Sequence, residues 1–335
     1  MKHGRLGCRS LRSLHNRLGS GTNVREVTTL SVDQRNDSGY ASMQEKYMDE
    51  IHIAESAKYA DVWGQSLYQP MHQKLLEFIE TTATKYNDFA YIGCGPNAPL
   101  FYTDLGIKII NKFENITLID LSERYLRTAQ FKGECLFPKI NMQTIACDIT
   151  GGLGDLFTEK IINSARNQIA PGSLSLPSIL KGNLPANSYD CIYSELVATY
   201  TGVPALKYFE EKCRAKEDLQ NCLNVWQGYN DKVVKLHIAD MYNALRNHGI
   251  SFLATDIKKR YKNNHFPCVA AVTKKSLSLP PINFYPSYLN EDIIWDDTSL
   301  DKYNRSTETS TFPHYHIVGC YGYEKSVKGC LKSVY

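Results

Sequence analysis

Residues Phe89 to Leu100 read Phe-Ala-Tyr-Ile-Gly-Cys-Gly-Pro-Asn-Ala-Pro-Leu. The apolar run Phe89 to Ile92 predicts a buried parallel strand, which ends at once in Gly93-Cys94-Gly95. Glycine at these positions permits a sharp turn and lets a ligand approach the backbone closely. We expect the turn to feed a helix, Ala98 to Lys112, whose free N–H groups face that ligand. A glycine turn that binds no ligand is the alternative.

The composition of the chain is that of a globular protein. Its 335 residues suit one large domain with appendages or two smaller domains. The net charge of +3 gives no support for nucleic acid as a partner. No run of about 18 uncharged apolar residues is found, so we expect no membrane span. The ten cysteines include no C-x-x-C pair, which favours free thiols over a metal site and predicts a cytoplasmic protein.

The N-terminal part differs in character from the rest. Residues 1–42 are rich in Arg, Ser, Gly and Asn, and they predict a mobile basic leader. Because an organelle transit peptide starts in a similar way, organelle import stays open beside the cytoplasmic expectation. Residues 43–88 predict helices that cap a ligand pocket, with Tyr59 and Trp63 either as its aromatic walls or as core residues. The two helices are expected at Met43–Trp63 and Leu67–Tyr86.

Strands alternate with helices along residues 89–335. This alternation predicts one α/β domain with a Rossmann-like, doubly wound, mostly parallel sheet. Residues 201–231 predict a helical insertion, Pro280–Thr311 looks irregular, and His314–Tyr323 predicts a late antiparallel strand. The basic run Lys258–Lys262 is interpreted as a solvated loop. Further strands are expected at Ile116–Asp120, Met142–Asp148, Tyr189–Glu195 and Gly249–Asp256, and helices at Ser122–Phe131 and Lys232–Asn247.

Three of the predicted strands end in an acid. These acids are Asp120, Asp148 and Glu195, and parallel strands bring their carboxyl ends to one edge, beside the glycine turn. Asp120 follows Gly95 by 25 residues, which suits a carboxylate that accepts hydrogen bonds from a ribose diol. Asp148 is placed to bind an adenine amino group. The alternative is that turns favour acids at strand ends.

The order and spacing of these motifs resemble those of class I S-adenosylmethionine-dependent methyltransferases. The matching residues are Gly93–Pro96, Asp120, Ala146–Asp148 and Asp190–Glu195, within about residues 68–256. The resemblance implies a seven-stranded sheet whose last strand is antiparallel, with S-adenosyl-L-methionine as cofactor. In the family, the glycine turn passes the methionine part of the cofactor. The acid matching Asp120 holds the ribose there, and the acid matching Asp148 lies beside the adenine.

Two positions depart from the family pattern. Tyr91 stands where an acid is frequent in the first strand, and Asn97-Ala98 replaces a further glycine after Pro96. In the transfer reaction the cofactor carries the leaving group, and the protein aligns the reacting atoms and excludes water. Glu195 is the candidate general base, or the carboxylate that holds a cationic amine. The alternative is a structural acid at a strand end whose hydrogen bonds are all made to neighbouring residues.

The expected activity is methyl transfer to an N or O nucleophile, with a small molecule or protein side chain favoured as the acceptor. The predicted catalytic residues are Glu195, Tyr193 and Tyr200, and His316 is a weaker candidate. The predicted cofactor-binding residues are Tyr91, Gly93, Cys94, Gly95, Pro96, Asp120, Leu121, Cys147, Asp148, Ile149, Ser194 and Glu195.

Three other functions remain open from the sequence. The tyrosine at position 91 and the unusual turn suit a degenerate methyltransferase fold that serves as a binding module. Gly93 to Ala98 also satisfies G-x-G-x-x-A, a dinucleotide fingerprint, which would indicate an NAD-dependent oxidoreductase. An aminopropyl transferase shares the sheet but needs further acids near the fourth strand, where Tyr193-Ser194-Glu195 supplies one.

Overall fold

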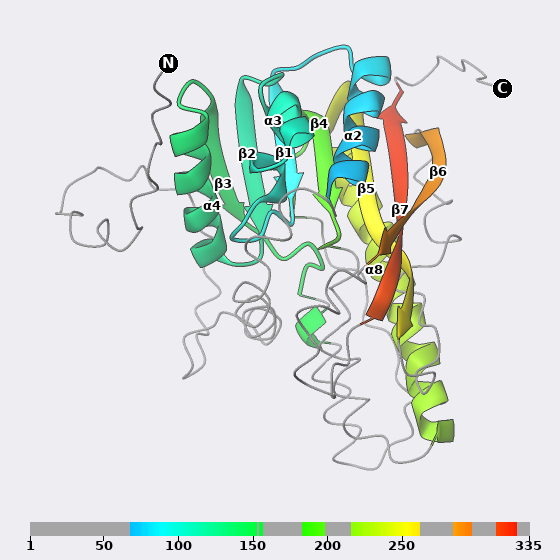
Figure 1. Cartoon of the computed structure of the whole chain (residues 1–335). Helices are drawn as coiled ribbons and strands as arrows, with labels where there is room; N and C mark the ends of the chain where they lie inside the picture. The colour runs from blue at the N-terminus through cyan, green and yellow to red at the C-terminus, as the bar shows by residue number, and fades with distance from the viewer. Residues whose placement is uncertain are drawn as a thin grey trace, which may run out of the picture.

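A computed structural model describes residues 68–152, 154–156, 183–197, 216–261, 284–296 and 313–326 (Figure 1). The predicted leader at 1–42, the helix at Met43–Trp63 with Tyr59 and Trp63, and the catalytic candidate Tyr200 lie outside the described residues. No helix among the described residues combines the length and apolar character that a membrane crossing requires.

The described strands form one sheet in the order β3-β2-β1-β4-β5-β7-β6. Neighbours among β1 to β5 pair in parallel, whereas β7 is antiparallel to both β5 and β6. The expected mostly parallel α/β sheet with a late antiparallel strand is therefore confirmed. The strands are β1 (Asp88–Ile92), β2 (Asn115–Asp120), β3 (Asn141–Ala146), β4 (Tyr189–Glu195), β5 (Leu245–Tyr261), β6 (Phe284–Asp296) and β7 (Pro313–Lys325).

Helices cover both faces of the sheet, as Figure 1 shows with α2 and α3 in front of the strands and α8 behind them. Alternate residues of β1 face the two sides: Phe89 and Tyr91 pack with α2, α3 and α4, whereas Ala90 and Ile92 pack with α8. This two-sided burial explains why β1 is a continuous apolar run. The helices are α2 (Gln69–Thr82), the 3₁₀ helix η2 (Pro99–Phe101), α3 (Asp104–Ile110), α4 (Glu123–Leu136) and α8 (Lys216–Ala244).

The chain after the glycine turn differs from the single helix predicted for Ala98 to Lys112. It forms the short η2 first, and α3 begins only at Asp104. Pro99 starts η2, and the Thr103 side chain accepts the Gly106 N–H as the cap of α3. Thr103 accepts one of the N–H groups at that end of α3, and the expectation that free helical N–H groups face a ligand stays a prediction.

Three further segments differ from the sequence expectations. The helix α8 begins at Lys216 and thus runs without interruption from the predicted 201–231 insertion into the predicted amphipathic helix. The basic run lies largely in β5, where Lys258 to Arg260 pair with β7, so the loop interpretation is wrong there. The strand β6 lies within Pro280–Thr311, which looked irregular. It forms a strand by pairing with β7, although its own sequence pattern does not predict one.

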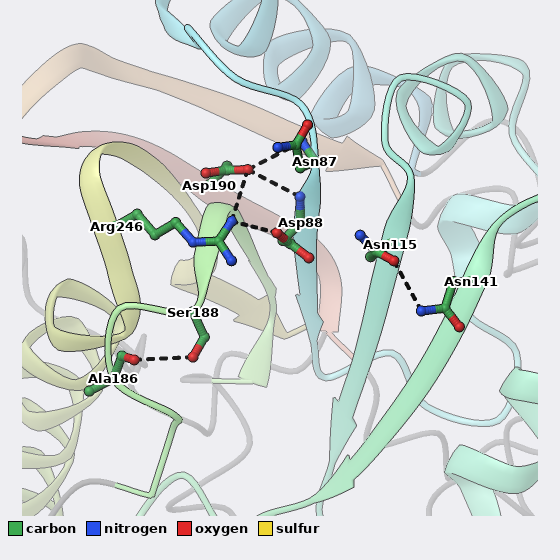
Figure 2. Close-up of polar contacts among 8 residues, drawn as sticks. All are labelled: Asn87, Asp88, Asn115, Asn141, Ala186, Ser188, Asp190 and Arg246. Carbon is green, nitrogen blue, oxygen red and sulfur yellow. Dashed lines mark hydrogen bonds and ion pairs between the residues drawn. The ribbon is translucent and has the colours of Figure 1, made fainter.

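The amino-terminal edge of the sheet is tied together by polar contacts (Figure 2). One carboxylate oxygen of the buried Asp190 accepts the backbone N–H groups of Asn87 and Asp88, each at 3.2 Å. The guanidinium of Arg246 lies 3.2 Å from the same oxygen and also pairs with the Asp88 carboxylate. Arg246 reaches them because residues 246–249 bulge out of the β4–β5 pairing. We name these residues, 87, 88, 190 and 246, the amino-edge clamp.

Candidate functional site

The glycine turn lies at the carboxyl end of β1, between β2 and β4. Both glycines have positive φ, +78° at Gly93 and +55° at Gly95, a region that other residues rarely adopt. A Cβ at Gly93 would stand 1.8 Å from Cγ2 of Val197 and 2.9 Å from the backbone oxygen of Glu195. The turn therefore packs tightly against the end of β4. This is the point where strand order reverses, the usual ligand position in such sheets.

Asp120 faces this turn from the end of β2. Its Oδ2 accepts the Gly95 N–H at 2.9 Å, and its Oδ1 accepts the Ser122 N–H at 3.2 Å. The sequence-based placement of this carboxylate beside the glycine turn is thus confirmed. Its part in holding a ribose stays a prediction.

The segment after Gly95 keeps its shape without a third glycine. Ala98 takes a positive φ of 44°, and its N–H donates to the Cys94 carbonyl at 2.9 Å. From α4, the Lys132 ammonium donates to the Pro96 carbonyl at 3.0 Å and to the Asn97 side chain at 3.3 Å. Backbone and lysine together hold the turn where no further glycine is present.

The Glu195 carboxylate is 4% exposed and lies on the face of β4 that α2 covers. The Tyr91 hydroxyl donates to its Oε2, and the stacked rings of Tyr91 and Tyr193 are 5.5 Å apart with an interplanar angle of 16°. Tyr91 of β1 thus lies against an acid supplied by the neighbouring strand β4. The structure thus joins Tyr91, Tyr193 and Glu195 in one buried group.

His72 and Thr103 complete this group, and sequence analysis did not single them out. His72 of α2 is fully buried, with Nε2 at 3.5 Å from Glu195 Oε1 and Nδ1 at 2.6 Å from Thr103 Oγ1. The one feature of the sequence that could have indicated His72 is its position, a polar side chain within the apolar stripe of α2. We call His72, Tyr91, Thr103, Tyr193 and Glu195 the buried acid cluster.

Burial sets the ionisation of the groups around this acid. It raises the pKa of Tyr91 and Tyr193 well above their ordinary value, and the Glu195 carboxylate raises both further. Both phenols stay protonated at neutral pH, so Tyr193 can donate a hydrogen bond but cannot act as a base. Burial also raises the pKa of the Cys94 thiol, with contributions from Asp120 and Glu195. Cys94 therefore lies near both carboxylates.

Asp148 is engaged by its own loop. Its carboxylate accepts the N–H groups of Thr150 and Gly152 and the Thr150 hydroxyl, each at 2.8 Å. The neighbouring Cys147 and Ile149 belong to the core on the α8 side. The Cys147 N–H donates to the Asp120 carbonyl at 2.8 Å and so ties the ends of β2 and β3. The structure brings Asp120, Cys94 and Glu195 together at the turn, whereas the Asp148 side chain stabilises its loop.

Ser194 lies on the opposite face of β4 from Glu195. Its hydroxyl is 2.8 Å from Nε2 of His237 in α8, and both side chains are fully buried. Ser194 was predicted to bind cofactor, and the structure places its hydroxyl against α8. Among the described residues, no three His, Cys, Asp or Glu side chains gather as a metal site would require.

We expect His237 to make stability depend on pH. Burial lowers the pKa of His237 to about 4, whereas histidine in an unfolded chain titrates near about 6.5. As pH falls, the unfolded chain binds this proton first, so stability present above pH ~6.5 is lost progressively down to pH ~4. In urea unfolding, the parent protein should lose about 2 kcal/mol more between pH 7 and pH 5 than His237→Gln. Equal losses would contradict a buried neutral imidazole.

Comparison with known proteins gives distant likeness only. No family model and no curated protein matches the sequence. The N-methyltransferase NodS from Bradyrhizobium japonicum WM9, solved with S-adenosyl-L-homocysteine, is 11% identical over 84% of this chain and 98% of its own, with a TM-score of 0.41. The cyclase SpnF is 12% identical over 85% of this chain and 97% of its own, with a TM-score of 0.45.

A third solved structure is an S-adenosylmethionine-dependent methyltransferase from Clostridium acetobutylicum ATCC 824. It is 12% identical over 84% of this chain and 100% of its own, with a TM-score of 0.37. Enzymes named for different reactions are among these structures. Likeness at this level therefore fixes neither the activity nor the substrate of this chain.

Proposed function

We propose that this protein is an S-adenosyl-L-methionine-dependent methyltransferase that transfers the methyl group to an N or O nucleophile on a small molecule or protein side chain. The observation that carries the proposal is the Asp120 carboxylate on the Gly95 N–H, at the point where strand order reverses. A carboxylate oxygen can accept more than one hydrogen bond, so the acid that holds the turn can also accept from a ribose diol.

The topology supports this assignment over an oxidoreductase, and the acids of β4 support it over an aminopropyl transferase. A classic dinucleotide-binding sheet has the order 3-2-1-4-5-6, whereas here the antiparallel β7 stands between β5 and β6. That arrangement agrees with the antiparallel last strand implied by the methyltransferase resemblance. An aminopropyl transferase would need more than one acid at the carboxyl end of β4. Of the two β4 acids, Asp190 belongs to the amino-edge clamp, which leaves Glu195.

When bound, S-adenosyl-L-methionine supplies an activated methyl group with a good leaving group. The residues of this chain have three tasks. The turn at Gly93–Gly95 and Asp120 hold and orient the cofactor, and the packed end of β4 excludes water. Glu195 accepts a proton from the nucleophile or holds a cationic amine in line with the methyl group. The protonated Tyr91 stabilises this carboxylate by donating to it.

Isothermal titration of the purified chain with S-adenosyl-L-methionine, S-adenosyl-L-homocysteine and NAD tests the proposal. We expect the first two to bind and Asp120→Ala to weaken both by about 1–3 kcal/mol, because the ribose hydrogen bonds are lost. The matched control is Glu134→Ala, which removes an exposed acid of α4 and should leave affinity unchanged.

Each of the other outcomes has a clear meaning. Unchanged affinity in Asp120→Ala would show that the ribose lies elsewhere. Binding of NAD in place of S-adenosyl-L-methionine would replace the methyltransferase by the oxidoreductase. Binding of none of the three at millimolar concentration would favour the degenerate binding module.

A further inference from the structure

We propose that His72 is a positioning residue: α2, which precedes the first strand of the sheet, completes the reaction site by holding the Glu195 carboxylate. The inference rests on the proposed function, because it concerns the carboxylate assigned to the nucleophile. The observation is a path of buried polar atoms that ends on two atoms without a hydrogen-bond partner, His72 Nε2 and Glu195 Oε1, which face each other. It runs from the Gly106 N–H to Thr103 Oγ1 at 2.9 Å, on to His72 Nδ1 at 2.6 Å, and from Nε2 to Glu195 Oε1 at 3.5 Å.

The chemistry of this path determines where the histidine proton lies. A carboxylate only accepts hydrogen bonds, so a bare Nε2 lone pair facing Oε1 would be repelled. With the carboxylate ionised, as its proposed role requires, Nε2 carries a proton. Thr103 Oγ1 already accepts the Gly106 N–H and can donate its own proton to Nδ1. The neutral Nε2–H tautomer suits both ends of the ring: Nδ1 accepts from Thr103, and the N–H of Nε2 faces Oε1 across 3.5 Å.

Both oxygens of Glu195 then face side chains from different elements. Tyr91 of β1 donates to Oε2, and His72 of α2 approaches Oε1. Among the described residues, the Glu195 charge also acts on Tyr193 of its own strand and on Cys94 in the turn. Because water has almost no access to this acid, these side chains and not solvent set its orientation.

The backbone beside Glu195 is constrained as well. Leu196 has a positive φ of 56° and is held by its N–H bond to the Ala254 carbonyl at 2.8 Å. Strained residues of this kind persist where the surrounding structure fixes them, as at ligand sites. The Glu195 backbone oxygen lies against Gly93, so main chain and carboxylate are both fixed next to the turn.

Histidine ring NMR tests the proposed proton position without any need for activity. In protein labelled with ¹⁵N-histidine, we expect the His72 signal of a ring protonated on Nε2. Glu195→Gln should shift this Nε2 resonance, whereas Asp120→Ala should leave it in place. A ring protonated on Nδ1 alone, or no response to Glu195→Gln, would overturn the inference.

A pair of cofactor analogues tests the positioning without knowledge of the methyl acceptor. Sinefungin carries an amine where the transferred methyl group stands, and S-adenosyl-L-homocysteine carries nothing there. An oriented Glu195 should favour sinefungin about 10-fold or more in the parent protein. We expect the preference to vanish in Glu195→Gln and in His72→Leu, and to survive in His72→Gln, which keeps an N–H donor.

The ratio of the two affinities separates positioning from general damage to α2. Leu75→Ala is the matched control, because it removes a buried apolar side chain of the same helix and should keep the preference. An unchanged preference in His72→Leu would overturn the inference while the proposed function stands. Failure of the parent protein to bind either analogue would instead remove the proposed function. The NMR result would still report on the His72–Glu195 pair.

Discussion

Replacing Gly93 by alanine should lower the free energy of unfolding by about 4 kcal/mol or more. Its φ of +78° is unfavourable for alanine, and the new Cβ would stand 1.8 Å from Val197 Cγ2 and 2.9 Å from the Glu195 carbonyl. Relief requires the end of β4 to move away from the turn, and this movement would also displace the Glu195 carboxylate. Urea denaturation gives the change in stability, and titration with S-adenosyl-L-homocysteine gives the effect on the site.

Two variants show whether close packing causes this loss. Gly228 in α8 has open space at its Cβ position, so Gly228→Ala should leave stability unchanged or raise it by up to about 1 kcal/mol. Adding Val197→Ala to Gly93→Ala should recover part of the loss, since the carbonyl contact and the strained φ remain. A Gly93→Ala protein as stable as the parent would mean that the turn is not packed against β4.

The second large effect is expected at the opposite edge of the sheet, in Asp190→Ala. This variant should cost about 3 kcal/mol, because it removes a buried acceptor from the Asn87 and Asp88 N–H groups and a partner from Arg246. The midpoint and slope of urea unfolding measure the loss. Asp190→Asn keeps one carbonyl acceptor and should lose less.

The control for the clamp is a polar pair nearby on the same edge. Asn141 donates to Asn115 across β3 and β2 at 3.0 Å, and this pair is exposed (Figure 2). We expect Asn141→Ala to change stability by no more than about 0.5 kcal/mol. Because the clamp lies far from the carboxyl ends of the strands, folded Asp190→Asn should bind S-adenosyl-L-homocysteine as the parent does. Equal losses in Asp190→Ala and Asn141→Ala would contradict the clamp.

Local patterns account for the parts of the fold that sequence reasoning predicted well. The strand β4 has the predicted bounds, Tyr189–Glu195, because its residues are buried along their whole length and Pro185 to Ser188 precede it as a turn. Asp120 was placed correctly for a similar reason. In a parallel sheet, the end of β2 has to meet the turn after β1, and the register pairs Ile92 with Ile119.

Longer-range context explains the failures. The strand β6 has no clear pattern of its own and becomes a strand by pairing with β7. The basic residues Lys258 to Arg260 look like a solvated loop, but the antiparallel partner extends β5 through them. The Asp148 carboxylate accepts the N–H groups of Thr150 and Gly152, loop contacts that the sequence did not predict, and its place beside an adenine stays a prediction. Such local competition for an acid is hard to recognise before the loop conformation is known.

The buried acid cluster was beyond sequence reasoning. Tyr91 and Glu195 are 104 residues apart, and His72 lies on a helix that the sequence analysis treated as a cap over the pocket. In the sequence, Tyr91 stood out as a tyrosine at a position where an acid was expected, because only its own strand was considered. The neighbouring strand supplies a carboxylate that accepts from the Tyr91 hydroxyl.

The amino-acid sequence by itself determined the strands β1 to β4, the sharp turn at Gly93–Gly95 and the acid that would meet it, because these depend on apolar runs, on glycine and on the geometry of parallel strands. Only the tertiary structure showed which side chains surround Glu195. It also showed that Asp190 stabilises the amino-terminal edge of the sheet. A hydrogen bond between distant residues depends on how helices and strands pack against each other. The spacing of apolar residues along the sequence does not predict that packing.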